Sequence, residues 1–156
     1  MEYTDNNIMN LVSQVRLPFG KGAVQADPAQ LAPLSLAYIG DTVYDLFVRT
    51  MLLETTTLTV HGLHERAAKL VCATAQSAAF RRIEPMLTEA ELSVFRRGRN
   101  SHIGTVPRSA SIIEYRIATG LEALFGWLYL SGEDGRIRLL MGEILAPVGT
   151  DGEKGE

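Results

Sequence analysis

Two acidic residues, Asp41 and Glu122, stand in helical stretches that are otherwise mostly apolar, LSLAYIGDTVYDLFVR and YRIATGLEALFGWLYL. An ionised carboxylate in apolar surroundings has a high desolvation cost unless a cation or several hydrogen-bond donors meet it. Neither acid has a basic side chain one helical turn away. Two interpretations follow. Each carboxylate caps a helix or pairs with a distant arginine, which periodicity alone favours, or the two acids hold a divalent metal ion.

A metal ion shared by these acids would serve phosphoryl transfer. Mg²⁺ prefers hard oxygen ligands, namely carboxylates, substrate phosphates and retained water. Such an ion lowers the pKa of a bound water and offsets the charge that builds on the scissile phosphate. Asp41 and Glu122 are therefore the candidate metal ligands and catalytic residues, with Mg²⁺ as the expected ion and Mn²⁺ as an alternative.

A second stretch, FRRGRNSHIGTVPR, is dense in arginine and in hydrogen-bond donors. The simpler interpretation is a solvated helix end, since cations favour helix C-termini. The number of donors supports the alternative, contacts with the phosphates and 2′-hydroxyls of RNA. The candidate RNA-binding residues are Arg96, Arg97, Arg99, Asn100, His102, Thr105 and Arg108.

The elements that must position these residues are helices, because the apolar residues recur at three- and four-residue spacing and little alternation is present. The expected fold class is all-α. Gly40 lies inside the helix that carries Asp41 at a cost of about 1 kcal/mol relative to alanine, which indicates close approach by another group. Capping sequences predict helix starts near residues 27, 88 and 111. The expected helices cover 27–53 with a kink or fresh start at Pro33, 60–84, 88 to about 98, 111 through Glu122 and beyond, and 133–145.

The composition is that of one globular domain, with 46% apolar and 21% charged residues. A net charge of −3 argues against nucleic-acid binding over the whole surface and leaves the arginine-rich stretch as the only candidate patch. The single cysteine, Cys72, fits a reducing compartment and is expected to be a buried structural thiol. No apolar run is long enough to span a bilayer, so we expect a cytoplasmic protein with no membrane partner. The expected organisation is a loosely ordered N-terminal extension over 1–26, a helical domain over 27–146 and a disordered tail over 147–156.

The stretch around Asp41 resembles the signature helix of ribonuclease III domains, whose Leu-Gly-Asp triplet appears here as Ile39-Gly40-Asp41. Together with FRRGRNSHIGTVPR and YRIATGLEALFGWLYL, it is similar to the short bacterial branch called Mini-ribonuclease III. The likeness runs from about residue 27 to 145. It implies a ribonuclease III-like catalytic domain over 27–146, in which Asp41 matches the signature aspartate and Glu122 the metal-binding glutamate.

The resemblance implies a homodimeric, metal-dependent endoribonuclease that cuts double-stranded RNA and leaves 5′-phosphate and 3′-hydroxyl ends. It also implies precursor 23S ribosomal RNA as substrate, a ribosomal-protein helper, and a signature helix whose Gly40 lies near the dimer axis. Two further acids of the larger enzymes are replaced, by Ala37 and Thr119, which leaves the number of bound metal ions open. Those replacements motivate an alternative function, a catalytically silent RNA-binding or ribosome-assembly module with the same fold.

Overall fold

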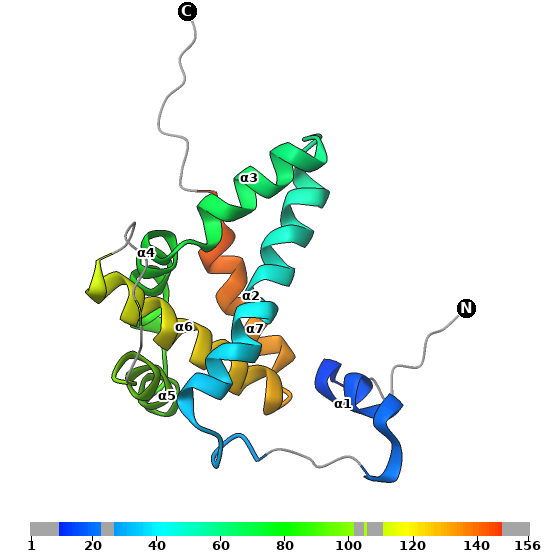
Figure 1. Cartoon of the computed structure of the whole chain (residues 1–156), viewed down its shortest axis with the longest axis vertical. Coiled ribbons are helices and arrows are strands. Elements are labelled where there is room, and N and C mark those ends of the chain that lie inside the picture. The colour runs from blue at the N-terminus through cyan, green and yellow to red at the C-terminus, as the bar shows by residue number, and fades with distance from the viewer. Residues whose placement is uncertain (1–9, 23–26, 102–104, 106–110, 148–156) are drawn as a thin grey trace, which may run out of the picture.

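The computed structural model describes residues 10–22, 27–101, 105 and 111–147, and within these every regular element is helical. The all-α prediction is confirmed. Helix α6 runs through the middle of the molecule, α2 crosses it, and α4 and α5 lie beside it (Figure 1). The elements are α1 (Leu11–Arg16), a 3₁₀ helix (Leu17–Gly22), α2 (Pro33–Thr55), α3 (Val60–Val71), α4 (Ala73–Ile83), a 3₁₀ turn (Glu84–Met86), α5 (Glu89–Arg99), α6 (Ile112–Leu130) and α7 (Asp134–Leu145).

Helix α6 is central because apolar residues cover nearly all of its circumference. Leu121, Ala123, Leu124 and Phe125 all have no exposed surface, although they point in different directions around the helix. A helix that is apolar on every side must be enclosed by other elements. Helix α2 makes the most extensive contact with it, followed by α5 and α4.

Two glycines allow α2 and α6 to cross with their backbones in contact. A Cβ atom at Gly40 would overlap the carbonyl group of Glu122, and one at Gly126 would overlap the carbonyl group of Leu36. Only glycine leaves room for such an approach. The close approach predicted for Gly40 is confirmed, and the group that approaches it is the backbone of α6 in the same chain.

Helix α5 begins where its sequence predicts. Thr88 and Glu91 form a complete capping box, in which the Glu91 amide donates to the Thr88 hydroxyl at 3.2 Å and the Thr88 amide donates to Glu91 Oε2 at 2.9 Å. Further along, a Cβ at Gly98 would stand 2.9 Å from the Cα of Gly120. The arginine-rich end of α5 is thereby pressed against α6.

Helices α3 and α4 replace the single helix expected over 60–84. The chain leaves the helical conformation at Cys72, whose ψ of 158° is extended. This break lets α3 pack against α2 while α4 packs against α6, two partners that one straight helix would not reach in the same way. Cys72 is exposed at the break, so the prediction of a buried thiol is wrong.

Helix α2 begins at Pro33, the fresh start that the sequence allowed, rather than at Asp27. Asp27 instead closes a turn, in which its Oδ1 accepts a hydrogen bond from the Ala29 amide at 3.0 Å. The short α1 packs onto the far end of the domain: Val12 is 3% exposed, and the Leu11 amide donates to Asp134 Oδ2 at 2.8 Å.

The described part of the predicted N-terminal extension is therefore helical over 11–22. Residues 1–9, 23–26 and 148–156, which include most of the predicted tail, lie outside the described residues. None of the helices in the described ranges is both long and apolar enough to cross a bilayer.

Candidate functional site

Asp41 and Glu122 come together where α2 crosses α6. Because Gly40 rests on the backbone of Glu122, the residue after it, Asp41, is placed beside the same turn of α6. Both side chains line one cavity of about 490 Å³ between α2, the α3–α4 junction and α6. The other residues that line it are Val71, Cys72, Ala73, Thr74, Gln76, Tyr115, Ala118 and Thr119.

The two carboxylates are in surroundings that oppose their ionisation. Desolvation by burial, together with the nearby charge of Asp41, raises the pKa of Glu122 to about 7. Desolvation also raises the pKa of Asp41, and the charge of Asp45 adds to the effect. The amide of Gln76 acts in the opposite direction on the pKa of Glu122. Two acids that resist ionisation in one cavity create a local demand for positive charge.

No cation of the described chain meets that demand. The ion pairs among the described residues leave out both Asp41 and Glu122, and Asp45 is bonded to Arg49 Nε at 2.8 Å. Neither acid is the N-cap of any described helix. The interpretation in which each acid caps a helix or pairs with an arginine therefore has no support in this part of the chain.

The donor set fits a hard divalent cation held by two protein carboxylates, with water and phosphate in the remaining positions. Ala37 is buried and apolar, and the Thr119 hydroxyl donates to the Tyr115 carbonyl at 3.0 Å, so neither position supplies a further charge. Within the described ranges, no cluster of three or more His, Cys, Asp or Glu side chains could hold an ion. An ion bound here would rely on Asp41 and Glu122 alone.

The predicted RNA-binding residues at the end of α5 separate into two groups. Arg96, Arg99 and Asn100 line a second cavity of about 490 Å³, whereas Arg97 turns away and donates from Nη2 to the Leu31 carbonyl at 3.3 Å. Only the first group is therefore available to a ligand in this cavity, which we call the arginine cleft.

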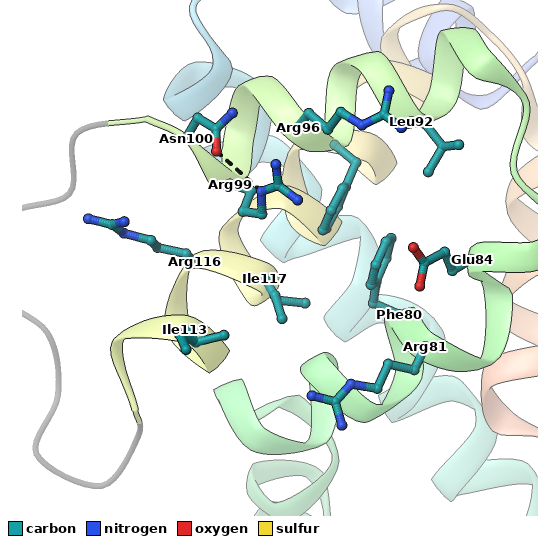
Figure 2. A pocket seen from close by; sticks show the side chains of 11 residues that line it. Phe80, Arg81, Glu84, Leu92, Arg96, Arg99, Asn100, Ile113, Arg116 and Ile117 are labelled. Atoms are coloured by element: carbon teal, nitrogen blue, oxygen red, sulfur yellow. Dashed lines mark hydrogen bonds between the residues drawn. The ribbon is translucent and has the colours of Figure 1, made fainter.

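The arginine cleft combines cations from three helices over an aromatic floor. Arg81 on α4 and Arg116 on α6 join Arg96 and Arg99 of α5 in its lining (Figure 2). The floor is Phe80 stacked on Phe95 with ring centroids 3.7 Å apart, and the Arg99 guanidinium lies 5.7 Å from the centroid of Phe95. Glu84 is the single acid in the lining. This surface suits a polyanion.

Sequence reasoning missed Arg81 and Arg116 because they lie far from the arginine-rich stretch in the chain. Arg116 is the fifth residue of α6, five positions after the N-cap Ser111, and nothing in its local sequence marks it out. Thr105 is exposed and does not line the cleft, and His102 and Arg108 lie outside the described residues.

Comparison with known proteins gives a consistent result for this chain. The Ribonuclease III domain family matches residues 34–133. A Mini-ribonuclease 3 of Symbiobacterium thermophilum is 48% identical over 112 residues, which cover 72% of this chain and 86% of the relative. One of Clostridium tetani is 44% identical over 123 residues, which cover 78% of this chain and 82% of the relative.

A crystal structure of a Fusobacterium nucleatum protein superposes with a TM-score of 0.68 at 30% sequence identity, covering 72% of this chain and 90% of that one. The matched family region contains Asp41, Glu122 and all the residues of the arginine cleft. The sequence similarity to the family therefore extends over both cavities.

Proposed function

We propose that Asp41 and Glu122 hold a Mg²⁺ ion with which this chain cleaves double-stranded RNA. The chain belongs to the ribonuclease III family, in its Mini-ribonuclease III branch, and is thus an endoribonuclease. The observation that carries this proposal is the shared cavity. Asp41 and Glu122 are 81 positions apart in the sequence, yet both line one cavity. Burial raises the pKa of each acid, and no cation among the described residues neutralises them. Mn²⁺ has the same preference for oxygen ligands and would serve in place of Mg²⁺.

The roles of the two acids follow from their positions. Asp41 and Glu122 would hold the ion between α2 and α6, and the backbone contact at Gly40 keeps their separation fixed. When bound, Mg²⁺ would supply a Lewis acid that activates water and offsets charge on the scissile phosphate. Glu122 would have to be ionised to hold it, so protons compete with the ion for this residue near pH 7. Hydrolysis by water would leave the 5′-phosphate and 3′-hydroxyl ends expected from the sequence.

The arginine cleft would grip the RNA backbone away from the cut. Arg81, Arg96, Arg99 and Arg116 present guanidinium groups, which suit phosphate oxygens, and Asn100 adds a polar group for a 2′-hydroxyl or phosphate. Helix α6 connects the two cavities, since Arg116 lies in its first half and Glu122 lies near its middle. Bound phosphates along α6 would thereby be held at a fixed distance from the acids.

A second copy of the chain is the partner we propose for the exposed start of α2. Tyr38, one turn before Asp41 on the same helix, is 82% exposed, and Leu34, two turns before it, is 45% exposed. Exposed large apolar side chains beside a site are typical of an interaction surface. A symmetric dimer would bring two sites to one RNA duplex, so that each could cut one strand.

The natural substrate we propose is precursor 23S ribosomal RNA, processed in the cytoplasm, with a ribosomal protein as helper. This assignment comes from the resemblance to Mini-ribonuclease III and from no contact in the molecule. Duplexes from that precursor, compared with unrelated duplexes of equal length, would test it. Equal cleavage of both would contradict it.

Asp41→Asn and Glu122→Gln test the site directly. Each change keeps the size of the side chain, so cleavage of an RNA duplex in Mg²⁺ should be abolished while RNA binding and the oligomeric state are retained. Glu143→Gln, an exposed glutamate on α7, is the matched control and should cleave like the wild type. Retained cleavage in both site variants would contradict the assignment.

The alternative function, a catalytically silent RNA-binding module, is favoured by one observation. Ala37 and Thr119 stand where larger members of the family have acids, and the cavity therefore offers two carboxylates. A duplex incubated with the wild type, with and without Mg²⁺, separates the two functions. The silent module would bind the duplex in a salt-dependent manner and yield no metal-dependent product.

A further inference from the structure

The N-terminus of α4 opens into the cavity of Asp41 and Glu122 without a side-chain cap. Its N-cap residue, Cys72, makes no hydrogen bond to the first turn, and both Cys72 and the first two helical residues line the cavity. The first amide bonded to a backbone carbonyl is that of Gln76, which donates to the Cys72 carbonyl at 2.9 Å. The amides of Ala73, Thr74 and Ala75 therefore remain as donors at the positive end of the helix dipole.

Gln76 adds a buried donor to the same wall. Its residue surface is 1% exposed, and its Nε2 is buried and completes no hydrogen bond among the described residues, although its amide lies near enough to Glu122 to lower the pKa of that carboxyl. A buried amide nitrogen without a partner is unfavourable, and a group that accepts its hydrogen bond when RNA is bound would explain why it is there. Because Gln76 lines the cavity, the missing acceptor would lie inside it.

The geometry points to a phosphate subsite: we propose that the first-turn amides of α4 and the Gln76 side chain together bind a non-bridging oxygen of the phosphodiester that lies between Asp41 and Glu122. This inference rests on the proposed function, since it takes RNA as the ligand. Helix N-termini with free amides bind phosphate groups readily. The carboxylates on the facing wall would repel a free anion, so the subsite favours a phosphate that arrives together with a divalent cation.

The thiol of Cys72 and the hydroxyl of Thr74 do not compete for this role. The Cys72 Sγ lies 3.5 Å from the Lys69 carbonyl, and the Thr74 hydroxyl donates to Glu114 Oε2 at 2.9 Å. The donors that remain for a phosphate oxygen are the backbone amides and the Gln76 Nε2. Thr119, which is neutral where larger family members have an acid, also lines this cavity.

Gln76→Leu removes the side-chain donor at nearly constant volume. Single-turnover cleavage of an RNA duplex should fall roughly 100- to 1000-fold, the range for loss of one donor to a reacting oxyanion. The melting temperature of the RNA-free protein should stay unchanged or rise, because the variant no longer buries an unpaired amide. Ser77→Ala is the matched control, since Ser77 is the next residue on α4, is 3% exposed and does not line the cavity.

A phosphorothioate at the cleaved linkage tests the contact itself. Sulfur accepts hydrogen bonds more weakly than oxygen. For one of the two configurations at phosphorus, replacing oxygen by sulfur should therefore slow the wild type by a larger factor than it slows Gln76→Leu. An equal loss in both proteins, for both configurations, would overturn the contact between Gln76 and a non-bridging oxygen.

Cys72→Ser tests the amides without touching Gln76. Serine at this extended N-cap position can accept from the first-turn amides, so it should raise the melting temperature and occupy the donors. Measured against Cys72→Ala, which has no such oxygen, Cys72→Ser should cleave RNA several-fold more slowly. Faster or equal cleavage by Cys72→Ser would overturn the role of the amides.

The outcomes also separate this inference from the proposed function. If the wild type gives no Mg²⁺-dependent product, the proposed function fails. If the wild type cleaves, and Asp41→Asn abolishes cleavage while Gln76→Leu cleaves like Ser77→Ala, the function stands and the subsite fails. A lower melting temperature for Gln76→Leu would show that the amide has a structural partner, which also overturns the subsite.

Discussion

Replacing Glu122 by glutamine should make the protein more stable at alkaline pH while it abolishes cleavage. Burial and the charge of Asp41 raise the pKa of Glu122 from 4.5 to about 7. The folded state thus holds its proton more tightly than the unfolded state does. The stabilising contribution of this proton is fully present below pH 4.5, and it is lost as the pH rises to 7. Each pKa unit corresponds to about 1.4 kcal/mol, so the loss amounts to about 3 kcal/mol at pH 8.

Glutamine keeps the shape of the side chain and cannot ionise, so Glu122→Gln escapes this loss. Urea unfolding should give a free energy of unfolding about 3 kcal/mol above the wild type at pH 8, and a difference near zero at pH 4. The exposed control Glu143→Gln should follow the wild type at both pH values. If Glu122→Gln were no more stable at pH 8, or if the difference did not change with pH, the reasoning from burial would be refuted.

Mg²⁺ gives the same experiment a second readout. An ion that binds only the folded protein at 100 times its dissociation constant stabilises it by about 2.7 kcal/mol. The wild type at pH 8 should therefore regain most of its deficit when Mg²⁺ is added, and Glu122→Gln should gain much less. The effect on the wild type should weaken below pH 7, where Glu122 is protonated. Equal stabilisation of both proteins would place the ion elsewhere.

Three further changes test the fold and the RNA contacts. Gly40→Ala should destabilise the protein by about 3 kcal/mol in urea unfolding, because the added Cβ overlaps the backbone of α6, whereas Gly142→Ala, where the added Cβ meets no neighbouring element, should stabilise it by up to about 1 kcal/mol. A tolerated Gly40→Ala would contradict the backbone contact. Arg116→Ala should weaken duplex binding and leave the melting temperature unchanged. The slope of log binding constant against log salt concentration should become shallower by about 1, the value for one lost phosphate contact. An unaltered slope would show that this arginine does not contact RNA. Arg136→Met should lower the free energy of unfolding by about 3 kcal/mol, because it leaves Glu91 without its cation. The Glu91 side chain is 6% exposed and its Oε1 lies 2.7 Å from Arg136 Nε. A variant as stable as the wild type would show that Glu91 finds another donor.

The helices could be predicted from the sequence wherever local chemistry decides them. The capping box at Thr88 and Glu91 is formed as expected, because its two hydrogen bonds involve residues three positions apart. The break at Cys72 could not be predicted in this way. Alanine-rich sequence on both sides favours one continuous helix, and the bend exists only because α3 and α4 pack against different helices.

The same distinction applies to the candidate site. The isolation of Asp41 and Glu122 among apolar residues is a local signal, and it identified both acids that share the cavity. Arg81 and Arg116 gave no such signal, because single exposed arginines on amphipathic helices are ordinary. Their significance arises only when α4, α5 and α6 bring them to one cleft. A residue that lines a shared cavity can be predicted from the sequence only if its type conflicts with its sequence neighbours, as a carboxylate among apolar residues does.

The acids and the glycines at the crossing of α2 and α6 are best understood as one feature. The ionised carboxylates repel each other, and burial disfavours their charged forms, so ionisation of the pair costs folding free energy. The surrounding helices must offset this cost to keep the two acids in one cavity. Gly40 and Gly126 let the backbones of α2 and α6 touch, and the resulting contact, the most extensive between the described helices, stabilises the arrangement. The arginines of the arginine cleft lie outside this crossing, and Arg81, Arg96 and Arg116 are exposed. Changes in the cleft can therefore alter which RNA is bound at little cost in stability, whereas changes at the crossing alter stability and cleavage together.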